Sequence, residues 1–247
     1  MTAKLFVHGV PDSPAVWRPV LTALDNPDLV THSPALPGFV DSAPAGFAAT
    51  KEAYTDWLIG EIESVANGEP IDIVGHDWGA LLTLRAASLK PELIRSWVIS
   101  GAVIHPDYRG HQAARAWNTP LLGEFVMSRA KPKALAEALH QAGLDQMIAQ
   151  EEAELWTRHK RQCILRLYRS AKGLRFSGDW VDRLESLPKS GLVIWGEMDP
   201  YVDLSFARSF ASDRGVDIMV LAGAGHWAIT QRAEQIADRL SSFWETL

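Results

Sequence analysis

Residues 75–79 read Gly-His-Asp-Trp-Gly and directly follow the apolar run at residues 71–74. Two glycines flank one central side chain, a spacing typical of a sharp turn from a strand into a helix that presents a nucleophile. Small flanking residues let the backbone adopt strained angles and lift the central side chain above the sheet. Most such turns carry Ser, but here the position is Asp77. The segment predicts a strand–turn–helix unit with a carboxylate at its apex.

Length and composition limit the classes of protein to consider. The chain has 247 residues, 47% of them hydrophobic, which suits one α/β domain with an insertion or two small domains. The formal net charge is -6 and no long basic run occurs, which argues against nucleic acid as a partner. Apolar runs stay well short of the roughly 18–20 residues of a membrane span. We therefore expect no membrane partner.

The N-terminal residues and the cysteine content indicate a compartment. Residues 1–7 lack the length and cleavage pattern of a signal peptide and are typical of a strand. Cys163 is the only cysteine, so the chain has neither an intrachain disulfide nor a thiol metal cluster. We expect a cytoplasmic protein in which Cys163 serves packing rather than chemistry.

Short apolar runs alternate with helical patterns, which is typical of a mainly parallel sheet covered on both faces. The expected strands span residues 4–7, 29–32, 71–74, 96–100, 192–195 and 217–221. A helix is expected over residues 54–65, with Thr50 as N-cap and Gly68 as stop. Further helices are expected from Trp78 to about Lys90, before Pro91, and over residues 236–247.

The alternation stops between residues 104 and 187. That stretch has a helical pattern rich in Ala, Arg and Gln and contains no convincing strand. The sequence predicts a helical insertion at 104–187 within a core formed by residues 1–103 and 188–247.

Four separated motifs have the order and spacing of one known fold. They are Val-His-Gly-Val-Pro at 7–11, Gly-His-Asp-Trp-Gly at 75–79, Trp-Gly-Glu-Met-Asp-Pro at 195–200 and Gly-Ala-Gly-His-Trp at 223–227. Together they resemble the α/β-hydrolase fold, in the branch with an aspartate nucleophile that contains epoxide hydrolases and haloalkane dehalogenases. The resemblance implies that 104–187 form the helical cap. It also implies a short sheet that lacks the first two of the usual eight strands, since the chain begins at the strand before His8.

The resemblance implies a catalytic triad of Asp77, Asp199 and His226. Asp77 is ionised at neutral pH and can attack a saturated carbon that bears an epoxide oxygen or a halide. His226 would then activate the water that cleaves the resulting ester, while Asp199 orients the imidazole. Three purely structural alternatives stay open: Asp77 as a helix N-cap, His226 as an ordinary loop histidine and Asp199-Pro200 as a turn. Asp107 is a rival to Asp199 for the role of the acid.

Other residues follow from the same motifs. The backbone N–H groups of Val10 and Trp78 are expected to stabilise the oxyanion, at about 2.7–4 kcal/mol for one such donor. The expected supporting residues around this loop and the turn are His8, Gly9, Pro11 and His76.

The leaving group decides between an epoxide and a halide. Epoxide hydrolases protonate the opening oxygen with two cap tyrosines, and Tyr168-Arg169 resembles the motif that carries one of them. A second tyrosine is not evident: Tyr108 lies near the start of the cap, and Trp117 stands in the expected region. Tyr168 could also be a packing residue.

Dehalogenases instead bind the halide with N–H donors. Trp78 fits their indole after the nucleophile, although epoxide hydrolases commonly have Trp there too. Many dehalogenases have Asn where this chain has Val10, and fluoroacetate-type enzymes favour Arg at position 78. These departures favour an epoxide hydrolase.

The sequence therefore predicts an α/β-hydrolase that opens an apolar or aromatic epoxide to a vicinal diol through an ester on Asp77. It would need no metal or organic cofactor and would bind a small-molecule substrate with Trp78, Trp117 and Tyr168. A haloalkane or haloacid dehalogenase and a ligand-binding member without turnover stay as alternatives. The oligomeric state stays open.

Overall fold

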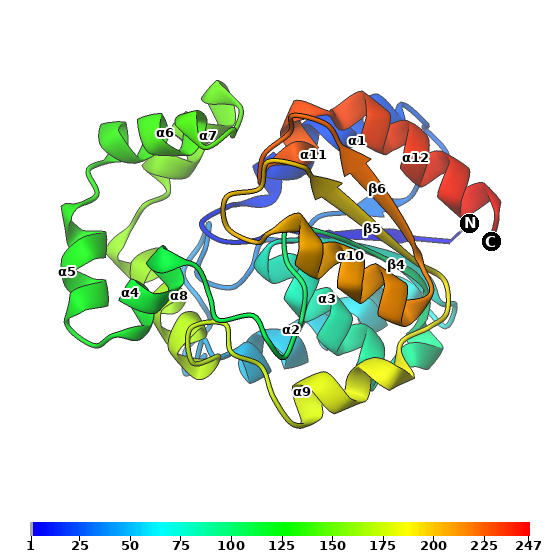
Figure 1. Cartoon of the computed structure of the whole chain (residues 1–247), viewed down its shortest axis with the longest axis horizontal. Helices are drawn as coiled ribbons and strands as arrows, with labels where there is room; N and C mark the ends of the chain where they lie inside the picture. The colour runs from blue at the N-terminus through cyan, green and yellow to red at the C-terminus, as the bar shows by residue number, and fades with distance from the viewer. Residues whose placement is uncertain (1) are drawn as a thin grey trace.

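Six parallel strands form one open sheet in the order β2-β1-β3-β4-β5-β6 in the computed structural model, which describes residues 2–247 (Figure 1). The strands are β1 (Lys4–Val7), β2 (Thr31–His32), β3 (Ile71–His76), β4 (Ile94–Ser100), β5 (Gly191–Gly196) and β6 (Asp217–Leu221). All five pairings are parallel, so the predicted sheet is confirmed. Only β2 is much shorter than predicted. It lies at the edge of the sheet with both residues exposed, where short strands are common.

Helices cover both faces of the sheet because successive side chains of a strand point to opposite faces. Leu5 and Val7 of β1 join one buried cluster, whereas Phe6 between them joins the other. The first cluster includes residues of α2 (Lys51–Ala66), α3 (Trp78–Leu89) and α10 (Leu204–Arg214). The second includes residues of η1 (Pro14–Trp17), α1 (Arg18–Leu24), α11 (Ala228–Gln231) and α12 (Ala233–Glu245).

The predicted limits of two helices agree closely with the structure. Thr50 caps α2, because its hydroxyl oxygen accepts a hydrogen bond from the Ala53 N–H at 3.2 Å. The helix ends at Asn67 in the left-handed conformation, one residue before the predicted stop. Helix α3 ends at Leu89, and Pro91 opens the short turn η2 (Pro91–Leu93).

The chain between β4 and β5 is helical. Its elements are α4 (Gln112–Asn118), α5 (Leu122–Arg129), α6 (Pro132–Gln141), α7 (Gln146–Glu154), α8 (Arg158–Ser170), α9 (Asp179–Asp182) and η3 (Arg183–Ser186). Figure 1 shows α4 to α8 grouped to one side of the sheet. As predicted, residues 104–187 contain no strand. We call this stretch the insertion; its division from the core as a separate domain stays a prediction.

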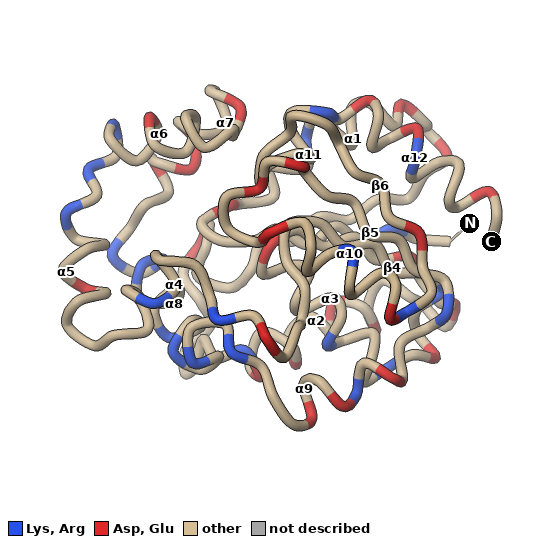
Figure 2. Tube along the Cα trace, viewed as in Figure 1, with Lys and Arg blue, Asp and Glu red and all other residues tan. Residues whose placement is uncertain are grey.

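Basic and acidic residues are mixed along the chain. Figure 2 shows Lys and Arg interspersed with Asp and Glu both around the sheet and in the insertion. Within residues 2–247, no helix is both long enough and apolar enough to cross a bilayer.

Candidate active site

Asp77 lies at the turn between β3 and α3. Its backbone has φ 51° and ψ -123°, a strained conformation for a residue with a side chain, and such strain is typical of functional sites. The turn is tight because a Cβ on Gly79 would lie 2.1 Å from the Val7 carbonyl oxygen. The Asp77 side chain makes no capping hydrogen bond to α3 and lines a cavity instead. The alternative of a simple N-cap does not fit this geometry.

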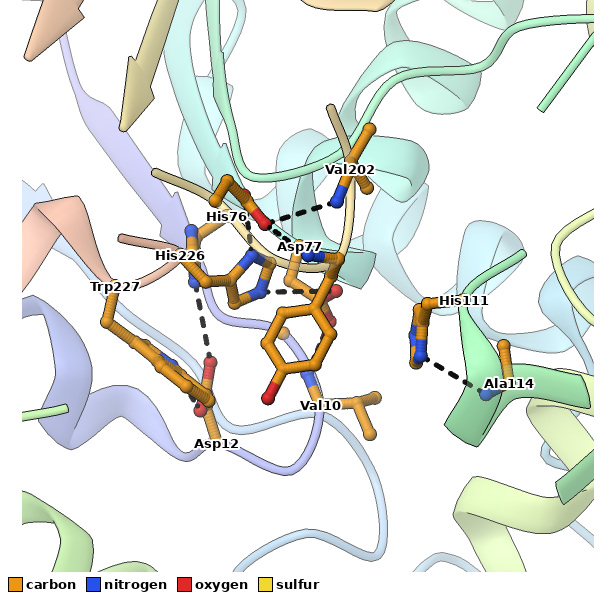
Figure 3. A network of polar contacts seen from close by, with 12 residues as sticks. Val10, Asp12, His76, Asp77, His111, Ala114, Val202, His226 and Trp227 are labelled. Atoms are coloured by element: carbon orange, nitrogen blue, oxygen red, sulfur yellow. Dashed lines mark hydrogen bonds and ion pairs between the residues drawn. The ribbon is translucent and has the colours of Figure 1, made fainter. Parts of the chain in front are cut away.

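One carboxylate oxygen of Asp77 faces the loop after β1. Asp77 Oδ1 accepts a hydrogen bond from the Val10 N–H at 2.8 Å, as Figure 3 shows. Gly9 permits this approach, since a Cβ there would lie 2.4 Å from the Asp77 Cβ and 2.6 Å from Oδ1. Trp78, the second predicted donor, begins α3, so its N–H is one of those that lack an intrahelical acceptor.

His8 fixes the conformation of this loop through two hydrogen-bonding contacts. Its Nε2 accepts a hydrogen bond from the Leu36 N–H at 2.9 Å, so the ring proton lies on Nδ1, 2.9 Å from the Gly9 carbonyl oxygen. Burial lowers the pKa of His8 to about 3, which keeps this arrangement neutral. Pro11 follows in the same loop and lines the cavity.

His226 lies between two carboxylates. Its Nδ1 is 2.8 Å from Asp199 Oδ2. Its Nε2 is 3.7 Å from Asp77 Oδ2, a contact that Figure 3 shows. The other oxygen of Asp199 accepts hydrogen bonds from the N–H groups of Tyr201 and Val202 at 2.8 and 3.1 Å, which fixes the carboxylate. The alternative acid, Asp107, has a side chain 78% exposed and faces Arg109.

The two carboxylates control the charge of His226. Burial opposes the charged imidazolium, but Asp199 and then Asp77 outweigh this effect and raise the pKa of His226 to about 10. The resting site therefore holds an imidazolium between two carboxylates.

His76 and Asp12 lie behind His226. The His76 ring is 4.8 Å from that of His226 between centroids, and its Nε2 is 3.9 Å from Asp12 Oδ2. Asp12 Oδ1 accepts a hydrogen bond from the Trp227 indole at 3.0 Å. Burial, and then the charges of Glu152 and Asp77, raise the pKa of Asp12 to about 8. Asp12 was not predicted from the sequence, although it directly follows the 7–11 motif.

A cavity of about 210 Å³ opens beside Asp77 and His226. Its wall is mainly apolar and comes from both the core and the insertion: Val10, Pro11, Asp77, His111, Ala113, Trp117, Val126, Met127, Ala130, Leu135, Ala138, Leu139, Trp156, Tyr168, Tyr201, His226 and Trp227. The wall contains no Lys or Arg. In the part of the chain described, no three His, Cys, Asp or Glu side chains group closely enough to hold a metal ion.

Two of the three predicted substrate-binding residues line this cavity. Tyr168 of α8 and Trp117 of α4 meet there, with ring centroids 4.9 Å apart. Trp78 is absent from the wall: it is fully buried and packs against Tyr168 at 5.4 Å. Helix α3 directs this indole into the core, so its position beside Asp77 in the sequence was a poor guide.

The structure also resolves which tyrosines have free hydroxyl groups. The hydroxyl group of Tyr108 donates to the Tyr201 carbonyl oxygen at 2.9 Å and is not available to a ligand. Burial together with Asp77 raises the pKa of Tyr168 well above the usual range, and a side-chain hydrogen bond with Trp78 only partly opposes this rise. His111 and Tyr201 also line the cavity, and neither was predicted from the sequence.

Comparison with known proteins agrees with this architecture. A model of the alpha/beta hydrolase family matches residues 5–239. The chain belongs to this family. Among curated relatives, it is 24% identical to an (E)-2-((N-methylformamido)methylene)succinate hydrolase from Acinetobacter baylyi, over 98% of this chain and 90% of the relative. It is 31% identical to an epoxide hydrolase from Caballeronia sordidicola, but over only 38% of this chain and 29% of that protein.

Solved structures share the fold at low sequence identity. A thermophilic esterase from Thermogutta terrifontis is 18% identical with a TM-score of 0.79, covering 100% of this chain and 90% of that one. An epoxide hydrolase from Vigna radiata is 21% identical, also with a TM-score of 0.79, covering 100% of this chain and 92% of the other. Their range of activities leaves the reaction of this chain to be argued from its site.

Proposed function

We propose that this α/β-hydrolase opens an uncharged epoxide to a vicinal diol through a covalent ester on Asp77. The observation that carries the proposal is that the two oxygens of the Asp77 carboxylate face different partners. Oδ1 is held by the Val10 N–H, whereas Oδ2 faces His226 beside an apolar cavity. A carboxylate placed in this way is a nucleophile for saturated carbon, because the product is a stable alkyl ester.

In the first step, Asp77 Oδ2 attacks an oxirane carbon and the carbon–oxygen bond of the ring breaks. Tyr168 gives its proton to the departing oxygen, which becomes a hydroxyl group. Its raised pKa keeps the phenol protonated in the resting state. The apolar wall without Lys or Arg favours an uncharged substrate.

In the second step, His226 takes a proton from water as the water oxygen attacks the Asp77 carboxyl carbon. Formation of the ester removes the negative charge of Asp77, one of the groups that raise the pKa of His226. The imidazolium therefore gives up its proton to the Tyr168 phenolate left by the first step, which restores the phenol and leaves a neutral imidazole as the base. The oxyanion develops on Oδ1, which Val10 already contacts. As the intermediate collapses, the departing diol oxygen takes the second proton of the attacking water from the Asp77 carboxyl group. Asp77 is then again a carboxylate and His226 again an imidazolium.

The decisive experiment traps the ester. His226→Gln is incubated separately with styrene oxide and with a bromoalkane, and the intact mass of the protein is measured. We expect an adduct with styrene oxide, and none in the matched Asp77→Ala variant. A folded His226→Gln protein that forms no adduct with the epoxide would overturn the proposal.

A dehalogenase is the second candidate, favoured by one observation. The Trp117 indole lines the cavity and could donate to a leaving halide. Trp78, the indole expected for that role, lies outside the cavity wall. An adduct with the bromoalkane alone, accompanied by bromide release, would establish this alternative.

A further inference from the structure

His111 belongs to the insertion and lies at the cavity that Asp77 and His226 line. It is the N-cap residue of α4 and lines the cavity with Asp77 and Tyr168. Its ring centroid is 5.1 Å from that of Tyr201 and 6.2 Å from that of Tyr168. This position faces the reacting end of the cavity, so the protonation of the ring matters to a bound substrate.

The helix fixes which ring nitrogen carries the proton. His111 Nδ1 accepts a hydrogen bond from the Ala114 N–H at 3.2 Å, shown in Figure 3. A nitrogen that accepts a backbone N–H must present its lone pair, so the proton of the neutral ring lies on Nε2. No residue in 2–247 forms a hydrogen bond with that Nε2. The N–H is therefore free for a ligand.

The ring also stays neutral. Burial lowers the pKa of His111 to about 4, despite the opposing charge of Asp77. A neutral imidazole N–H is a hydrogen-bond donor but a very weak acid, so it stabilises a developing negative charge without giving up its proton. Tyr168 supplies the proton, and the Tyr108 hydroxyl group is not available as a second donor because it already donates to the Tyr201 carbonyl oxygen.

We propose that His111 Nε2–H is the second hydrogen-bond donor to the oxygen released from the oxirane ring, paired with Tyr168. This inference rests on the proposed function and adds to it one specific catalytic residue. The hydrogen bond at the N-terminus of α4 holds His111 in the required tautomer. The insertion therefore contributes both the acid, Tyr168, and the second hydrogen-bond donor, His111.

The test measures the rate of ester formation in the His226→Gln background, where the adduct accumulates. Styrene oxide is the probe, with rapid quenching and intact mass as the readout. His111→Ser keeps an N-cap oxygen for Ala114 but removes the ring N–H. We expect ester formation to slow by roughly 10²-fold, the usual effect of losing one oxyanion donor, with an unchanged Tm.

Two further variants sharpen the result. His111→Asn keeps a cap acceptor and adds an amide N–H, so it should recover part of the lost rate. Tyr201→Phe removes the hydroxyl group of the rival donor in the cavity wall, and it should slow ester formation far less than His111→Ser does. If Tyr201→Phe slows ester formation and His111→Ser does not, the assignment to His111 is wrong.

The outcomes also separate the two proposals. An adduct in His226→Gln that forms equally fast with His111→Ser overturns only the role of His111. Absence of any adduct in folded His226→Gln overturns the ester mechanism, and the role of His111 with it.

Discussion

The backbone nitrogen of Val10 lies 2.8 Å from Oδ1 of Asp77, which commits one oxygen of the nucleophile to the loop after β1 before any substrate binds. Oδ2 is left to face His226 and the cavity. The carboxylate cannot rotate without losing that hydrogen bond. The contact therefore preorganises both the attacking oxygen and the site of the later oxyanion.

The close approach of Gly9 to Asp77 predicts the effect of a single methyl group. Gly9→Ala would place a Cβ 2.4 Å from the Asp77 Cβ, so the loop must move and the Val10 N–H must leave Oδ1. We expect kcat to fall by roughly 10²–10³-fold. Gly60→Ala is the matched control, because nothing lies within 4 Å of its added Cβ in α2. Steady-state kinetics with equal loss in both variants would contradict this prediction.

Tyr168→Phe tests the proposed acid. Removal of the hydroxyl group should slow ester formation by about 10²–10⁴-fold, the usual contribution of a positioned acid. Tyr54→Phe is the control: its hydroxyl group donates to the Pro37 carbonyl oxygen at 2.8 Å, and Tyr54 is absent from the cavity wall. Rapid-quench mass measurement in the His226→Gln background gives the rates. Full activity in Tyr168→Phe would assign protonation to another group.

The raised pKa of His226 predicts how stability changes with pH. The folded value is about 10 and the reference value 6.5, so the imidazolium contributes stability that is fully present below about pH 6.5. That contribution is lost as pH rises toward 10. Asp199→Asn removes the strongest source of the shift, so its stability should depend less on pH in this window. Urea unfolding of both proteins across the window provides the comparison, and identical slopes would count against the ion pair.

The raised pKa of Asp12 predicts a second, separate change of stability with pH. Burial raises its pKa from 3.8 to about 8, so the folded protein binds a proton that the unfolded chain releases, and stability falls as pH rises between these values. Asp12→Asn keeps an oxygen acceptor for the Trp227 indole but cannot ionise. The variant should gain stability relative to the native protein as pH rises from 4 to 8. A pH-independent difference in the free energy of unfolding would show that Asp12 is not the titrating group.

The sequence predicted those features that depend on local pattern. Strands β1, β3, β4 and β5 are almost fully buried and mostly apolar, which made them easy to find. The two edge strands are more exposed, and of these only β2 was much overestimated. Asp77 was found because its strained backbone requires small neighbours that are visible in the sequence.

Features that depend on packing were not predicted. His111 and Tyr201 come from different segments and reach the cavity only when α4 packs against the loop after β5. Trp78 was expected in the cavity because it is adjacent to Asp77, yet a helix directs neighbouring side chains to different sides. Its indole packs behind Tyr168 instead.

A buried ion pair in the insertion provides the last prediction. Lys160 Nζ of α8 lies 3.0 Å from Glu152 Oε2 of α7, and both side chains are fully buried. Lys160→Met would leave the Glu152 carboxylate buried without its partner, so we expect a loss of about 3–5 kcal/mol in the free energy of unfolding.

The double variant Lys160→Met, Glu152→Leu removes both charges and should recover most of that stability, because two apolar side chains of similar size need no partner. Lys90→Met is the control, since its pair with Glu63 is exposed and should contribute less than about 1 kcal/mol. Urea unfolding measures all three. Helix α8 also carries Tyr168, so the single variant should slow ester formation as well. A double variant as unstable as the single one would show that packing around Lys160, rather than charge pairing, holds α7 against α8.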